Sequence, residues 1–163
     1  MTTPLLMPSL FISHGAPDLP LSECPSREFL SRLGEQLPHP TAILAISPHW
    51  MTSVPTLSTA PQMRAIHDFG GFSEALYRLQ YDAPGLSNGL HEASAAQLKA
   101  AQLPMATDPS RGLDHGAWVP LLLMYPNARI PVAQLSLPAH WPPEQLMSLG
   151  KALATLRTKG VLI

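Results

Sequence analysis

Residues 42–47 read Ala-Ile-Leu-Ala-Ile-Ser, a short run without charge that lies between Pro40 and Pro48. A strand with one face in water alternates apolar and polar residues, whereas a strand covered on both faces is apolar throughout. The run therefore predicts a central strand of a parallel sheet with helices packed against both of its faces.

The rest of the chain alternates between short apolar runs and segments of helical character. Helices are predicted where apolar residues recur every three or four positions or where helix-forming residues predominate. Strands are predicted at residues 9–13, 42–47, 54–58 and 132–137, and helices at residues 25–37, 72–79, 87–103, 117–125 and 142–159. This alternation indicates an α/β fold, a mainly parallel sheet flanked by helices on both faces, in a single domain over residues 1–163.

The last four residues, 160–163, add an expectation about the edge of the sheet. Gly160 is a natural stop for the preceding helix, and the apolar residues after it have the character of a buried strand that is beginning. Because domains usually end in surface segments, we expect a sheet truncated at its C-terminal end. A short terminal strand that closes the sheet is the alternative. An open edge can pair with another chain, so a homo-oligomer is one expected assembly.

Composition excludes several classes of partner. The net charge is -1, with 10 Lys and Arg against 11 Asp and Glu, which provides no basic surface for nucleic acid. No apolar run approaches the roughly 20 residues that a membrane span needs, and the first ten residues lack the basic start of a secretory signal. Cys24 is the single cysteine, which excludes an internal disulfide framework and favours a cytoplasmic location.

Two histidines follow predicted strands at matching places. His14 comes directly after residues 9–13, and His49 comes two residues after residues 42–47. Ligands of parallel sheets bind beyond the carboxyl ends of the strands, so both imidazoles are expected in one crevice. The pair predicts a metal site with His14 and His49 as ligands. Imidazole suits iron and zinc, so the residues leave Fe(II) and Zn(II) both open. Either histidine alone would more often be an ordinary loop residue.

Two further histidines are candidates for other roles. His115 lies between glycines just before an apolar helix, and its ordinary pKa near neutrality suits a general acid or base. A solvated ring beside a capping Asp114 is the alternative. His67 and Phe72 belong to a glycine-rich aromatic segment that either lines a pocket for a flat substrate or closes a loop.

The sequence lacks the motifs of several other enzyme classes. No glycine motif for ATP or NAD occurs, and no G-x-S-x-G nucleophile turn is present. Two alternatives to an oxidative enzyme stay open at this point. One is a zinc-dependent hydrolase that uses the same crevice with a metal-activated water. The other is a non-catalytic remnant of a longer protein.

A set of motifs in fixed order carries a family resemblance. They are SHGAP (13–17), SPHW (47–50), IHDFGGF (66–72), YDAPG (81–85), GLDHGAW (112–118) and IPVAQLS (130–136). Together they resemble the class III extradiol ring-opening dioxygenases of the LigB superfamily, in particular the DOPA 4,5-dioxygenase-like branch. The resemblance extends over essentially the whole chain.

The resemblance implies a metal-dependent enzyme that opens a catechol-type ring beside its diol with O2 and yields a semialdehyde. It implies His14 and His49 as metal ligands, His115 as the acid and base of the active site, and His67 near the substrate. Fe(II) would serve catalysis, and Zn(II) can occupy the same site. Family members continue beyond the strand that begins at residues 160–163 with a Gly-Ser-Gly-Asn…His stretch, which implies a further ligand there.

Overall fold

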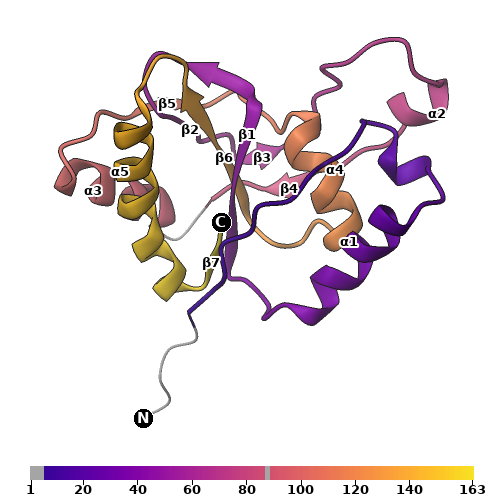
Figure 1. Ribbon diagram of the computed structural model, residues 1–163, viewed down its shortest axis with the longest axis horizontal. Coiled ribbons are helices and arrows are strands. Elements are labelled where there is room, and N and C mark those ends of the chain that lie inside the picture. Colours follow the sequence, from indigo (N-terminus) through magenta and orange to yellow (C-terminus); the bar gives the residue numbers. More distant parts are fainter. Residues whose placement is uncertain (1–5, 87–88) are drawn as a thin grey trace.

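The computed structural model describes residues 6–86 and 89–163 and contains a five-stranded sheet of order β5-β2-β6-β1-β7 (Figure 1). Its strands are β1 (Ala42–Thr52), β2 (Thr56–Ser58), β5 (Ala106–Asp108), β6 (Val132–Pro138) and β7 (Val161–Leu162), and a separate pair joins β3 (Gln62–Met63) to β4 (Ala83–Pro84). β1 is parallel to β6 and β7, and β2 is parallel to β5. The mainly parallel sheet that the sequence predicts is confirmed.

One pairing departs from that pattern, because β2 runs antiparallel to β6. β2 follows β1 after residues 53–55 alone. A connection this short reverses the chain direction, since a parallel crossover needs a dozen residues or more. Because β1 is parallel to β6, β2 must then oppose β6.

Helices cover both faces of the sheet, as expected from the apolar run in β1. The helical elements are η1 (Leu19–Leu21), α1 (Pro25–Gln36), α2 (Glu74–Tyr77), α3 (Leu90–Ala100), α4 (His115–Met124), α5 (Pro143–Ala154) and η2 (Thr155–Lys159). One core cluster joins α1 and α4 to Ile43 of β1, and a second joins α3 and α5 to its neighbours Ala42 and Leu44. Successive residues of β1 therefore enter opposite cores.

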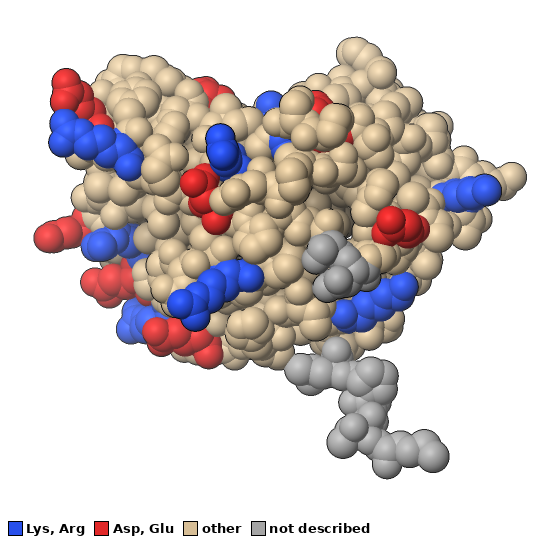
Figure 2. All heavy atoms as spheres, turned by 180° about the vertical axis from the view of Figure 1, so that it is seen from behind, with Lys and Arg blue, Asp and Glu red and all other residues tan. Residues whose placement is uncertain are grey.

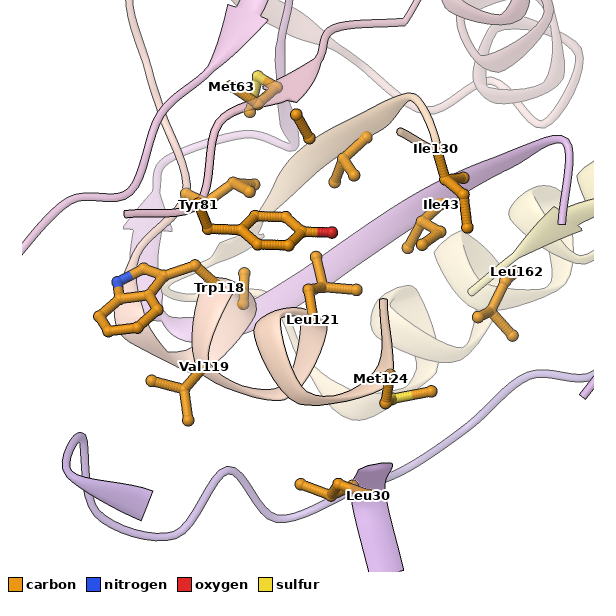
Figure 3. Close-up of a cluster of buried hydrophobic side chains, with 14 of the residues drawn as sticks. Leu30, Ile43, Met63, Tyr81, Trp118, Val119, Leu121, Met124, Ile130 and Leu162 are labelled. Atoms are coloured by element: carbon orange, nitrogen blue, oxygen red, sulfur yellow. The ribbon is translucent and has the colours of Figure 1, made fainter. Parts of the chain in front are cut away.

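The core around α4 holds the largest buried side chains. Trp118 and Tyr81 are 0% and 1% exposed. Figure 3 shows Leu121 and Met124 of α4 in the same cluster as Ile43 and Leu30. Full burial of one such side chain contributes about 1.5–3 kcal/mol. Several of them lie on α4, so this helix is firmly anchored against the sheet.

Most predicted elements are confirmed with shifted ends. α1 and α5 agree closely, and Gly160 ends η2 with a φ of +81°, the left-handed conformation that glycine adopts readily. The predicted helix 72–79 is shortened to α2, and α3 begins at Leu90, while Ser87 lies outside the described residues. α4 begins two residues before its predicted start, which makes His115 its first residue.

The predicted strand at residues 9–13 is wrong. This segment has no strand assignment. It makes a single backbone contact, in which the Leu10 N–H donates to the Ile163 carbonyl at 2.7 Å, and just before it the Met7 N–H donates to the Arg157 carbonyl at 3.1 Å. Pro8 has no N–H, so a regular ladder cannot form across it. Phe11 is fully exposed. His14 therefore lies on an irregular segment rather than at a strand end.

β1 is longer than predicted, and this changes the position of His49. The strand extends to Thr52, with a register shift in its pairing to β6 between Ile46 and Met51. Pro48 lies inside this irregular stretch and cannot donate to a ladder. His49 therefore lies within β1, at an interruption of the ladder, and not beyond the end of the strand.

Charges are sparse and mixed on the surface. On the face shown in Figure 2, the basic and acidic side chains intermingle between wide uncharged areas. Among the described residues, no helix has both the length and the hydropathy that a membrane crossing requires.

Candidate metal centre

Three histidines from distant parts of the chain meet at one place. His14 comes from the irregular N-terminal segment, His49 from β1, and His115 from the first position of α4. Their ring centroids are 5.1 Å apart for His14 and His49, 5.0 Å for His14 and His115, and 4.0 Å for His49 and His115. One ligand atom from each ring lies within 4.8 Å of the others. The convergence expected for His14 and His49 is present, and His115 joins them.

The geometry of two rings fits a bound divalent ion. The Nε2 atoms of His14 and His49 face each other at 3.1 Å. Two nitrogens on one ion at about 2.0–2.1 Å lie about 2.8–3.4 Å apart for bond angles between 90° and the tetrahedral value. Burial lowers the pKa of His14, and the neighbouring His115 and His49 lower it further. A neutral imidazole is the form that binds a metal.

A glycine allows α4 to approach β1 closely enough to form this cluster. A Cβ atom at Gly116 would lie 2.9 Å from Cδ2 of His49 and would also meet the hydroxyl of Ser47. Real Cβ atoms do not tolerate such contacts, so only glycine fits between helix and strand here. The glycine-framed loop predicted around His115 thus serves a close helix-to-strand approach.

The carboxylate of Asp68 fixes His115 through two hydrogen bonds. Oδ1 of Asp68 accepts a hydrogen bond from Nδ1 of His115 at 2.8 Å and another from the His115 backbone N–H at 3.0 Å. Burial acts to raise the pKa of Asp68, but these hydrogen bonds and the nearby ring lower it overall. His115 is 6% exposed, so the solvated ring considered from the sequence is wrong.

A second carboxylate, Asp114, lies fully buried beside the cluster. Its Oδ2 accepts from Nε2 of Gln134 and from Nη2 of Arg111, the latter at 3.2 Å. Its backbone N–H donates to Oε1 of Gln134 at 3.1 Å, and the Arg111 guanidinium lies 4.9 Å from the ring centre of Trp50. Asp114 occupies the N-cap position of α4 but makes no capping bond with its side chain, contrary to the capping role considered for it.

An aromatic wall borders the histidines. Phe69 meets the ring of His115 edge-on, with centroids 5.7 Å apart, and Phe72 meets Phe69 at 5.4 Å. His67 lies farther back, with Nε2 3.0 Å from the Leu79 carbonyl oxygen and its ring against Trp118. Neither His67 nor Phe72 is part of the histidine cluster, and Phe69 is the aromatic residue next to it.

Sequence reasoning missed several residues of this site. Asp68 lies in the segment IHDFGGF (66–72), and no local pattern links it to His115, because the bond between them spans 47 positions of the chain. Gln134 carried a usable signal as a polar residue inside an apolar predicted strand. A buried amide needs hydrogen-bond partners, and Gln134 finds them in Asp114.

Comparison with known proteins agrees with this geometry. Residues 22–163 match the family model described as the catalytic LigB subunit of aromatic ring-opening dioxygenase. The chain belongs to the LigB family. It is 44% identical over 161 residues to a 4,5-DOPA dioxygenase extradiol of Beta vulgaris and 40% identical over 161 residues to one of Escherichia coli, which identifies the DOPA dioxygenase-like branch.

The match covers the chain but only part of its relatives. The alignments cover 95% of this chain and 59% of the Beta vulgaris protein, and 96% and 57% for the Escherichia coli protein. The crystal structure of uncharacterized protein JW3007 from Escherichia coli K12 superposes with a TM-score of 0.74 at 32% identity, over 96% of this chain and 57% of that one. This chain of the LigB family thus spans less than two thirds of the length of these relatives.

Proposed function

We propose that this chain carries the metal centre of an extradiol dioxygenase that opens a catechol-type ring with O2. The observation that supports this most strongly is the meeting of His14, His49 and His115 beside an aromatic wall. In the proposal, residues 1–163 form one domain of extradiol-dioxygenase type. Relatives named as DOPA dioxygenases support a substrate of the DOPA class, and they do not favour the zinc-dependent hydrolase.

The proposed roles follow from what each side chain can reach. His14 and His49 would hold the metal through their facing Nε2 atoms. Fe(II) is the proposed catalytic ion, and Zn(II) fits the same nitrogen ligands. A bound Fe(II) ion would supply the redox chemistry of ring opening.

The other proposed roles concern the substrate, namely the proton of its diol and the packing of its flat ring. Nδ1 of His115 is engaged by Asp68, so Nε2 would accept the proton of a catechol hydroxyl and later return it. Phe69 and Phe72 would pack against the flat ring, with His67 behind them. The carbon–carbon bond beside the diol breaks, and both atoms of O2 enter the semialdehyde, so no outside reductant is needed.

The remaining parts of the proposal concern the setting of the enzyme. A cytoplasmic location is supported by the single cysteine, which suits a reducing compartment. The mixed surface charge supports a small-molecule substrate rather than nucleic acid. A homo-oligomer and the absence of a membrane partner stay predictions.

The test is metal loading followed by turnover. The purified chain is loaded with Fe(II) without oxygen, its iron content is measured, and O2 uptake and the ring-cleavage chromophore are followed with DOPA. We expect bound iron and a chromophore, and we expect His49→Ala to lose both. His39→Ala is the matched control, because His39 is exposed and outside the cluster. A wild-type chain that binds no iron and forms no chromophore contradicts the proposal.

A further inference from the structure

Asp68 joins two parts of the site that are far apart in sequence. It lies in the segment between β3 and α2, whereas its partner His115 begins α4. One oxygen atom of Asp68 accepts from both the backbone N–H and the ring of the same residue, at 3.0 Å and 2.8 Å. The bond to the backbone N–H satisfies one of the free donors at the start of α4. The bond to the ring has a different consequence.

The ring bond determines which nitrogen of His115 carries the proton. An ionised carboxylate only accepts hydrogen bonds, so Nδ1 of His115 must be the donor. In a neutral imidazole the other nitrogen then carries the lone pair. That nitrogen is Nε2, which Asp68 leaves free, and the centroid of the ring lies 5.0 Å from that of His14 and 4.0 Å from that of His49.

Free histidine in water prefers the opposite tautomer, with the proton on Nε2. In that form the ring would present an N–H to the cluster and could not accept a proton from a substrate hydroxyl. The buried carboxylate of Asp114 does not take this role, because its Oδ2 accepts from Arg111 and Gln134 and its Oδ1 makes no hydrogen bond to His115 or to any other described residue. Among the described residues, Asp68 is the group that bonds to Nδ1 of His115.

We propose that Asp68 is a positioning residue that fixes His115 in its Nδ1-protonated tautomer and thereby keeps Nε2 free to accept the substrate proton. This rests on the proposed function for its catalytic consequence, but the tautomer itself needs neither metal nor turnover. When the hydroxyl proton moves to Nε2, the ring becomes an imidazolium, and the carboxylate of Asp68 stabilises that charge through the same hydrogen bond.

The first experiment measures the tautomer directly. Ring ¹⁵N signals of the metal-free chain, labelled at histidine, are recorded by two-bond proton–nitrogen correlation, and His115 is assigned by its absence in His115→Gln. We expect Nδ1–H in the wild type, the same tautomer in Asp68→Asn, because an amide oxygen still accepts, and a shift toward Nε2–H in Asp68→Ala. Asp82→Ala is the matched control, since Asp82 is an exposed carboxylate elsewhere on the surface.

The second experiment separates positioning from folding. In the iron-loaded chain, Asp68→Ala should lower kcat by about 10- to 100-fold with KM and iron content unchanged, and Asp68→Asn should recover part of the loss. Iron lost in proportion to kcat would overturn the assignment, because Asp68 would then support a metal ligand.

Three tautomer results would also overturn the proposal. They are an Nε2–H form in the wild type, an unchanged Nδ1–H form in Asp68→Ala, and the same shift in Asp82→Ala. The wild-type measurement decides even if Asp68→Ala does not fold. If the wild type shows the expected tautomer but opens no ring, the proposed function fails and the tautomer assignment stands.

Discussion

The two sides of the histidine cluster are built very differently. On the α4 side, His115 is buried, begins a helix anchored in the core, and is held by two hydrogen bonds to Asp68. On the N-terminal side, His14 lies on an irregular segment, and its Nδ1 is buried without a hydrogen-bond partner among the described residues. Phe11, three residues before it, is fully exposed.

The difference indicates which side chain of the site is held in place by folding alone, before any ligand binds. The position of His115 follows from core packing and hydrogen bonds, which folding itself stabilises. The position of His14 has little of this support, so a bound ion would add most of its constraint there. The four predictions below test this contrast between the α4 side and the N-terminal side.

The largest expected effect concerns the packing under α4. Trp118 is fully buried, and its indole N–H donates to the Ile66 carbonyl at 3.0 Å, close to the segment that carries Asp68. Trp118→Ala should lower the free energy of unfolding by about 3–5 kcal/mol. Phe11→Ala, on the N-terminal side, should change it by less than about 0.5 kcal/mol. Urea denaturation measures both, and similar losses would remove the contrast.

Metal binding should stabilise mainly the N-terminal side of the cluster, around His14. At a Zn(II) concentration of a hundred times its Kd, the free energy of unfolding should rise by about 2.7 kcal/mol. Hydrogen–deuterium exchange should slow most around residues 12–16 and little around residues 113–118. A chelator should reverse both changes, and His14→Ala, compared with His39→Ala, should abolish them. Equal slowing on both sides would show that His14 is already fixed without metal.

Gly116 tests the close approach of α4 to β1. Gly116→Ala introduces a methyl group that would lie 2.9 Å from Cδ2 of His49, so we expect a loss of roughly 1–3 kcal/mol in unfolding free energy and weaker Zn(II) binding. Gly150→Ala is the matched control, because nothing lies within 4 Å of its added methyl group. That change in a helix interior should stabilise by roughly 0.5–1 kcal/mol. A Gly116→Ala chain as stable as wild type would contradict this reading.

The smallest expected effect lies at the turn that leads to Arg111. Asp108 accepts from the hydroxyl and the backbone N–H of Ser110 and from the backbone N–H of Arg111, and these bonds lower the pKa of Asp108 although partial burial opposes them. A carboxyl whose pKa is lower in the folded state than in the unfolded state stabilises the folded protein at pH values above its unfolded-state pKa. That stabilisation is lost as the pH falls through the folded-state pKa.

Asp108→Ala should therefore cost less than about 1 kcal/mol at neutral pH, because the carboxyl is only partly buried and solvent screens it. The difference from wild type should shrink at an acidic pH below the lowered folded-state pKa of Asp108, because the carboxyl is then protonated in both states. Denaturation curves at both pH values measure it. A difference that persists in acid would show that the turn does not depend on the charge.

The parts of the fold that were predicted depend on local patterns. The apolar run of β1, the helical spacing of α1 and α5, and the stop at Gly160 each lie within one short stretch of chain. The wrong strand at residues 9–13 had an apolar composition as well, but nothing in that stretch specifies a partner strand. Strand formation needs a neighbour, and composition does not supply one.

The candidate site was also predicted only in part. The convergence of His14 and His49 followed from the expected ends of two strands, although neither histidine lies at such an end. The bond between Asp68 and His115 could not be predicted, because it depends on how a loop packs against a helix 47 positions later. The sequence shows glycine at position 116, but the contact that requires it appears only in three dimensions.

The interruption in β1 has a mechanical consequence for His49. The strand pairs with β6 on both sides of it, through Ile46 before and Met51 after. The backbone at His49 is thus fixed by pairing to β6 both before and after it, unlike the backbone at the free end of a strand. Changes in the turn after Thr52 should therefore leave the position of His49 nearly unaltered, and a proposed ligand supported in this way tolerates nearby substitutions better than one on a loop would.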